Sequence, residues 1–210
     1  MNILFIGDIF SKPGRKAVAN ELPKILAKKK IDFVIANAEN CTHGRSLNLK
    51  HYNHLKLCGV QCFTFGNHTW ENEQIEDILS QTDTVRPINI KKTSYLNKMG
   101  QGSRVFKIGK KKVRITNVIG LSANAKGVQS NPFLYMDEFL PTIKNKQDIH
   151  IVDFHTNSTS EKVAFFTAYK GMVSAILGTH THVQTADEEI RDRTAFITDV
   201  GMTGPSQGVI

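Results

Sequence analysis

The sequence has no uninterrupted apolar run of about 18 residues, which excludes a membrane-spanning helix. It has only three cysteines (Cys41, Cys58 and Cys62), which cannot all pair and show no C-x-x-C spacing. A disulfide scaffold or a zinc knuckle is therefore disfavoured. Its start lacks a basic region and reaches Asp8 too early for a signal peptide. We expect a cytoplasmic protein with no membrane partner.

Long disordered or low-complexity segments are also lacking, since 40% of the 210 residues are hydrophobic and 22% are charged. Lys and Arg number 27 against 19 Asp and Glu, a net charge of +8. A positive field attracts anions such as nucleotides or RNA, although a general lysine-rich bias explains the excess equally well. The lysines cluster only at 28–30 and 110–112, which argues against an RNA-binding arm.

Short apolar runs alternate with amphipathic stretches, which predicts a layered α/β domain. The expected strands are short apolar runs at 2–6, 33–36, 62–65, 150–154, 175–177 and 194–198. The expected helices cover 15–29, the region around 49–55, and 160–170. Ser11–Gly14 predicts a turn, and Pro23 predicts a kink or a restart in the first helix.

The middle of the chain differs from this pattern. Residues 104–108 and 113–118 flank a lysine-rich turn and predict an antiparallel hairpin, so we expect mixed sheets. Residues 120–132 are polar and irregular, which predicts a surface loop. No repeat and no linker interrupts the sequence, so residues 1–210 are predicted to form a single domain.

Polar residues that can bind metal follow the carboxyl ends of successive expected strands. In open α/β sheets, ligands bind at this edge. His180 and His182 add weight, because residues i and i+2 of an extended chain face the same side. The predicted metal ligands are Asp8, Glu39, Asn40, Asn67, His155, His180 and His182.

These donors are oxygens and imidazole nitrogens without cysteine, which disfavours thiolate chemistry. Seven donors exceed the four of one tetrahedral zinc and suit two first-row ions such as iron or manganese. Two divalent ions and two carboxylates leave a positive site that attracts an anion. A phosphate ester fits this charge, and a hydroxide bridging the two ions supplies a nucleophile at neutral pH.

Five segments occur in a recognisable order: Gly7-Asp8, Asn37-Ala38-Glu39-Asn40, Gly66-Asn67-His68-Thr69-Trp70, Asp153-Phe154-His155 and Gly178-Thr179-His180-Thr181-His182. With Thr198–Pro205, they resemble the YmdB-like branch of the calcineurin-like metallophosphoesterase superfamily. The resemblance runs from residue 3 to residue 210. It implies a four-layer α/β sandwich with mixed central sheets and a di-iron or di-manganese centre. It also implies hydrolysis of phosphodiesters, including 2′,3′-cyclic and other cyclic nucleotides.

The resemblance also implies a role for each site residue. One metal would be held by Asp8, Glu39, Asn40 and His182. Glu39 would bridge to a second metal held by Asn67, His155 and His180. His68 would donate the proton to the leaving oxygen as the catalytic residue, or alternatively would only orient a ligand.

The sequence departs from the family pattern at its C-terminal end, after His155, and at Asp187–Arg193, a stretch that is shorter than usual. Family members continue for several tens of residues beyond Val209-Ile210, a segment expected to add strands to the second sheet. The C-terminal portion is therefore short or missing by that measure, and the sequence leaves the reason open. Thr156-Asn157 replaces the Ala-Glu that commonly follows the metal-binding histidine, which bears on substrate preference.

Three other functions remain as alternatives to a metal-dependent phosphodiesterase. A phosphomonoesterase would use the same attack, and the sequence does not separate the two. A non-catalytic scaffold of this fold would lack several ligands, whereas all seven and His68 are present here. A nucleic-acid-binding module would need no metal and would depend steeply on salt. A small phosphodiester or nucleotide is the expected partner; RNA ends and a homo-oligomer remain open.

Overall fold

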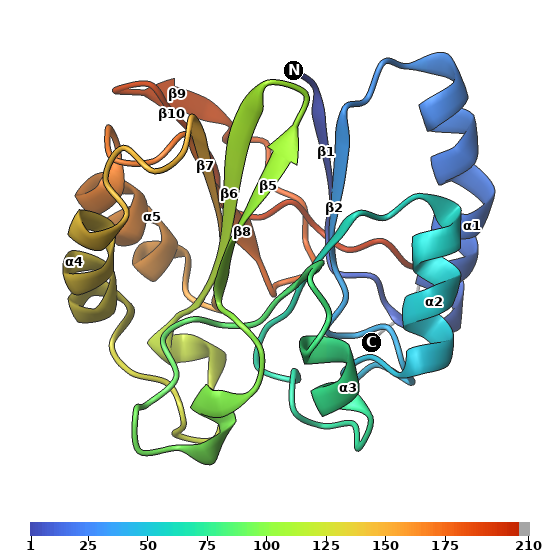
Figure 1. The fold of residues 1–210 in the computed structure, drawn as a ribbon, viewed down its shortest axis with the longest axis horizontal. Helices are drawn as coiled ribbons and strands as arrows, with labels where there is room; N and C mark the ends of the chain where they lie inside the picture. Colours follow the sequence, from blue (N-terminus) through green and yellow to red (C-terminus); the bar gives the residue numbers. More distant parts are fainter. Residues whose placement is uncertain (206–210) are drawn as a thin grey trace.

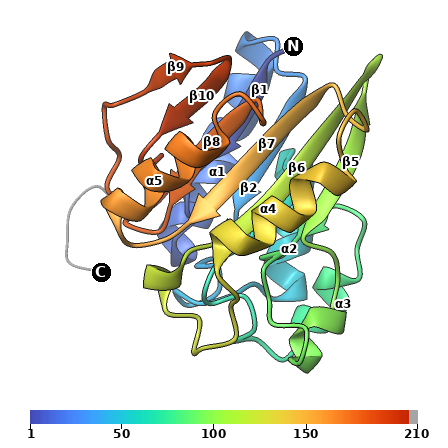
Figure 2. The same ribbon diagram turned by 90° about the vertical axis from the view of Figure 1, so that its left-hand side faces the viewer.

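The computed structural model describes residues 1–205, which form two β-sheets packed face to face with helices on both outer faces (Figure 1). Figure 2 shows α4 and α5 lying across the outer face of the larger sheet. The expected continuation beyond Val209-Ile210 lies outside the described residues. No helix within 1–205 combines the length and hydropathy needed to cross a membrane.

The smaller sheet has four strands, all parallel, in the order β1-β2-β3-β4. Its strands are β1 (Ile3–Ile6), β2 (Phe33–Asn37), β3 (Cys62–Thr64) and β4 (Thr84–Val85). Its helices are α1 (Ser11–Lys28), α2 (Leu49–Cys58) and α3 (Ile75–Leu79). Helix α2 begins where the Asn48 side chain accepts the His51 N–H and ends at Gly59, whose φ of 114° suits glycine.

The larger sheet has six strands in the order β5-β6-β7-β8-β10-β9, with both parallel and antiparallel pairs. Its strands are β5 (Ser103–Ile108), β6 (Lys111–Ile119), β7 (Ile149–His155), β8 (Ala175–Thr179), β9 (Glu189–Arg191) and β10 (Thr194–Ile197). Its helices are α4 (Pro132–Thr142) and α5 (Thr159–Tyr169). Short 3₁₀ helices cover Tyr95–Lys98 and Leu121–Ala123.

Three apolar clusters hold the layers together. One lies between the smaller sheet and its helices, around Val34, Leu55 and Phe63. A second lies between the larger sheet and its helices, around Phe154 and Phe165. The third joins strands of both sheets, from residues such as Phe33, Ile35, Ile115 and Ile151. These three interfaces define a four-layer α/β sandwich, which confirms the expected fold class.

Several local expectations need correction. Ser11–Gly14 is not a turn but the first turn of α1, because proline is tolerated where the helix N–H groups lack partners anyway. The same helix continues through Pro23, held by Val18 and Leu22, which are buried against the sheet. The expectation of mixed sheets holds for the six-stranded sheet, whereas the four-stranded sheet is parallel. The sequence reading also missed α3 and α4.

Candidate active site

Residues from both sheets meet at one edge of the sandwich, where the parallel strands end. Asp8 follows β1, Glu39 and Asn40 follow β2, Asn67 and His68 follow β3, His155 ends β7, and His180 and His182 follow β8. The Asp8 carboxylate accepts the backbone N–H of His180 over 2.9 Å, although 172 residues separate them. All eight predicted site residues therefore lie at the edge where the sequence places them.

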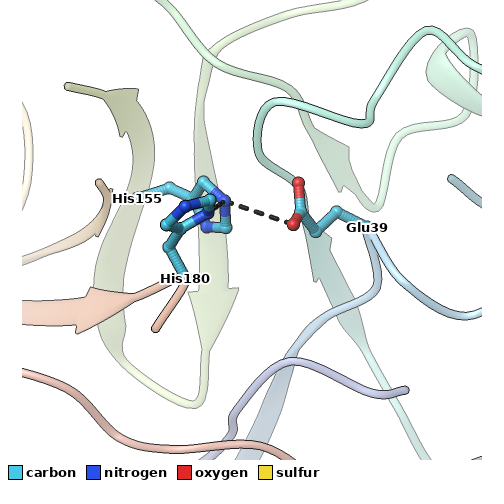
Figure 3. Close-up of side chains that lie close together, drawn as sticks. All are labelled: Glu39, His155 and His180. Carbon is cyan, nitrogen blue, oxygen red and sulfur yellow. Dashed lines mark hydrogen bonds and ion pairs between the residues drawn. The ribbon is translucent and has the colours of Figure 1, made fainter. Parts of the chain in front are cut away.

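Three polar side-chain atoms crowd around one ring nitrogen of His155. Its Nε2 lies 2.9 Å from Nδ1 of His180, 3.0 Å from Oδ1 of Asn67 and 3.2 Å from Oε1 of Glu39. An imidazole nitrogen carries either one hydrogen or one lone pair, so it can satisfy only one of these neighbours. Figure 3 shows the two histidine rings facing Glu39. Glu39, His155 and His180 form a group that could hold a metal ion.

The remaining predicted ligands lie around this group. Nε2 of His182 lies 3.2 Å from Oδ1 of Asn40, whose amide nitrogen donates to the Gly44 carbonyl. Oδ1 of Asp8 is buried, has no hydrogen-bond partner in the described residues, and lies 3.9 Å from Nδ1 of His155. A buried carboxylate oxygen without a donor is costly unless a cation satisfies it. The oxygen and nitrogen set therefore fits divalent metal ions.

Gly66 leaves the space that this arrangement needs. A Cβ atom at this position would lie 2.3 Å from Nε2 of His155 and 2.4 Å from Oε2 of Glu39. Both distances are far below a normal contact, so any side chain would displace the donor atoms. Glycine at position 66 therefore keeps the space between the Glu39 carboxylate and the His155 ring open.

A buried hydrogen-bond chain fixes the tautomer of His155. Oγ1 of Thr179 donates to Oδ1 of Asp153 over 2.7 Å, which uses its only hydrogen. Thr179 therefore accepts from Nδ1 of His155, 2.9 Å away. In the neutral ring this leaves a lone pair on Nε2, the atom that faces the other predicted metal ligands. Asn37 completes the chain by donating to Oδ2 of Asp153 over 3.0 Å.

The charges of the group compensate one another without a metal. Burial raises the pKa of Asp8 to about 8, against the opposing charge of His155. Burial alone would lower the pKa of His155, but the Glu39 carboxylate raises it to about 9. Burial would raise the pKa of Glu39, but His155 lowers it to about 2. Burial and the His155 charge lower the pKa of His180 to about 4. Protons on Asp8 and His155 thus occupy a site that suits cations.

The backbone of His68 contacts Glu39, whereas its ring faces Glu71. Its backbone N–H donates to Oε2 of Glu39 over 3.0 Å, while Nδ1 of its ring lies 3.1 Å from Oε2 of Glu71. Glu71 also pairs with Lys126 and Arg45, at 3.1 and 3.4 Å. Burial would raise the pKa of Glu71, but Lys126 and His68 lower it. The His68 side chain is 27% exposed, so solvent or a substrate can reach it.

One part of the sequence reasoning is wrong. His180 and His182 do not lie on an extended strand, because both have positive φ values, 101° and 64°. They enter the site through a turn that follows β8 instead. Thr156 and Asn157 are the residues that depart from the family pattern after His155. The structure shows a contact that depends on the first of them: Thr156 is buried, and its hydroxyl donates to Oε2 of Glu161 over 2.6 Å.

The sequence reading also missed residues that support the site. Asp153 and Thr179 orient His155, and Glu71 contacts His68. A signal existed for Asp153, because a carboxylate inside an apolar strand needs buried partners. Glu71 stands three residues after His68, a spacing that brings side chains together in a helical turn.

Two packed sheets that bring these donors to their carboxyl edge define a calcineurin-like metallophosphoesterase fold. The chain belongs to the YmdB-like family, whose model, described as YmdB-like protein, matches residues 4–210. It is 44% identical to a candidate phosphatase/phosphodiesterase of Mycoplasma pneumoniae, over 100% of this chain and 75% of that protein. It is 40% identical to the 2′,3′-cyclic-nucleotide 2′-phosphodiesterase of Bacillus subtilis, over 100% of this chain and 78% of that protein.

A solved structure is similar over nearly the whole chain. A crystal structure described as a novel phosphatase from Mycoplasma pneumoniae superposes with a TM-score of 0.91 and 45% identity. The match covers 95% of this chain and 71% of that one. The chain thus spans about three quarters of the length of these relatives.

Proposed function

We propose that this chain is a metal-dependent phosphodiesterase that hydrolyses small phosphodiesters, with 2′,3′-cyclic nucleotides as the first substrates to test. The observation that carries the proposal is the convergence of Glu39, Asn67 and His180 on Nε2 of His155 within 3.2 Å. The cyclic-nucleotide specificity is supported by the name of the Bacillus subtilis relative, which is 40% identical. A cytoplasmic location and a single domain over 1–210 remain predictions.

Two metal ions, iron or manganese, are part of the proposal. Asp8, Glu39, Asn40 and His182 would hold one ion, and Glu39 with Asn67, His155 and His180 the other. When bound, the ions supply Lewis acidity toward phosphate oxygens and lower the pKa of water to near neutrality. The oxygen and imidazole donors and the unsatisfied Oδ1 of Asp8 support this assignment.

His68 is proposed to give the leaving oxygen its proton. Its backbone N–H donates to Glu39, and its side chain is 27% exposed, so a substrate can reach the ring. Glu71 lies against Nδ1, which leaves Nε2 as the nitrogen that would carry the transferred proton. An alkoxide leaves poorly without a proton, so this contribution matters most for a ribose leaving group.

The experiment combines metal analysis with a substrate panel. Protein purified without oxygen is analysed for bound metal and assayed on bis-nitrophenyl phosphate, nitrophenyl phosphate and 2′,3′-cyclic AMP. We expect two metal equivalents and hydrolysis of the diesters above the monoester. Glu39→Gln is the matched control and should lose at least one metal and nearly all activity. Activity that survives exhaustive chelation would contradict the proposal, and preference for nitrophenyl phosphate would favour the monoesterase alternative.

A further inference from the structure

His180 and His182 lie in a turn with an uncommon backbone conformation. Their φ values, 101° and 64°, fall in a region that residues with a Cβ rarely adopt. Such conformations persist only where the surrounding structure holds them. Asp8 accepts the N–H of His180, and Thr181, the residue between the two histidines, carries the other buried contacts of this turn.

A single buried carboxylate holds Thr181. Oδ2 of Asp199 accepts the Thr181 backbone N–H over 3.0 Å and the Thr181 hydroxyl over 2.8 Å. Oδ1 of Asp199 accepts the Gly201 N–H over 2.8 Å. Asp199 is fully buried and follows β10, the strand that pairs in parallel with β8. The turn that carries the histidines is therefore anchored to the end of the neighbouring strand.

Lys162 of α5 provides the charge that this carboxylate needs. Its Nζ lies 2.7 Å from Oδ2 of Asp199, and both side chains are at most 1% exposed. Asp199 is the only partner of that Nζ among residues 1–205. A Cβ at Gly178 would lie 3.1 Å from Cδ of Lys162, so the lysine chain packs closely beside β8. Removing either partner would leave a buried charge uncompensated.

We propose that Lys162, Asp199 and Thr181 form a positioning unit that holds His180 and His182 in place, although none of the three is a proposed metal ligand. The inference rests on the proposed function insofar as the two histidines bind metal. A purely structural role would attach α5 to the sheet and affect only stability. A positioning role affects metal affinity and turnover at unchanged stability, so the two are separable.

Thr181→Val is the mildest test, because it removes the hydroxyl contact and keeps the backbone contact. We expect its affinity for Mn²⁺ to fall by about 10- to 100-fold, the range for partners that orient metal ligands. We expect kcat to fall with little change in KM, and the melting temperature of the metal-free protein to stay near that of the wild type. Thr181→Ser keeps the hydroxyl and should restore both affinity and kcat.

Thr194→Val is the matched control at the opposite end of β10. The Thr194 hydroxyl is also buried, donating to Val173 over 2.6 Å and accepting from Gly171 over 2.8 Å. This variant should lower the melting temperature while keeping the wild-type affinity for Mn²⁺. Lys162→Met tests the charge, and we expect it to weaken Mn²⁺ binding even where binding is measured well below its melting temperature.

Wild-type Mn²⁺ affinity in both Thr181→Val and Lys162→Met would overturn the positioning role. So would a loss of affinity in Thr194→Val as large as that in Thr181→Val. A wild-type protein that binds two Mn²⁺ but hydrolyses no phosphate ester would refute the proposed function, and the affinity comparison would still decide the positioning role. A wild-type protein that binds neither Mn²⁺ nor Fe²⁺ would contradict both.

Discussion

Metal binding should expel protons from the predicted metal ligands, and the number of protons released follows from the pKa values of those ligands. At pH 7, Asp8 with a pKa of about 8 and His155 with a pKa of about 9 are both mostly protonated. Glu39 and His180, with pKa values of about 2 and about 4, have already lost their protons. Filling both metal positions should therefore release about two protons.

The sign of the pH dependence follows directly. Raising the pH removes the protons that compete for Asp8 and His155, so metal binding strengthens as the pH rises towards 8. With about two protons released, the overall binding constant for two ions should increase by about 100-fold per pH unit between pH 6 and 7. Acidification should release the metal, and activity should fall in parallel.

Calorimetry with Mn²⁺ measures the proton count without reference to activity. Titrations in buffers of different ionisation enthalpy give the number of released protons from the slope of the observed enthalpy. Asp8→Asn serves as the control, since it removes one titrating group and should lower that number by about one. A binding enthalpy independent of the buffer at pH 7 would refute the reasoning, because it would mean that both groups are already deprotonated.

Three further outcomes are expected. His68→Ala should keep both metals but lose about 10²–10⁴-fold on 2′,3′-cyclic AMP and much less on bis-nitrophenyl phosphate; equal losses on both would argue against proton donation. Gly66→Ala should lose metal by elemental analysis, since its Cβ would lie 2.3 Å from Nε2 of His155. Burial lowers the pKa of His150 to about 3, so the stability that His150 contributes should decline from about pH 6.5 downward by about 1.4 kcal/mol per unit. The difference in urea unfolding between metal-free wild type and His150→Gln measures this contribution.

The strand positions and the site edge were predictable because they depend on local patterns. Buried strands such as 33–37 are short apolar runs, and parallel strands necessarily end at a common edge. Helix α4 was missed, although Asn131 before Pro132 is a common start signal: the Asn131 side chain accepts the N–H groups of Phe133 and Leu134. The turn expected at Ser11–Gly14 failed because proline is compatible with both a turn and a first helical turn.

The supporting contacts could not be predicted, because they join residues that only the fold brings together. Asn37 and Asp153 are 116 positions apart and come from different sheets. The pairing of Lys162 with Asp199 depends on how α5 packs against β8 and β10. The positive φ of His180 likewise occurs in a turn held by distant residues, since Asp8 accepts the His180 N–H and Asp199 accepts the Thr181 N–H. Sequence patterns predict which residues are candidate ligands, whereas tertiary packing determines how those side chains are oriented.

The links between the two sheets explain why the donors are held so close together. Asn37 of the smaller sheet donates to Asp153 of the larger sheet, and Asp8 accepts the N–H of His180 across the same junction. Hydrogen bonds to buried polar groups are costly to lose, so the two sheets cannot shift without leaving a carboxyl group unsatisfied. The same contacts crowd Glu39, His155 and His180 into one space. A divalent cation there would pair with donors that are otherwise balanced only by protons, so bound metal should stabilise the junction of the two sheets.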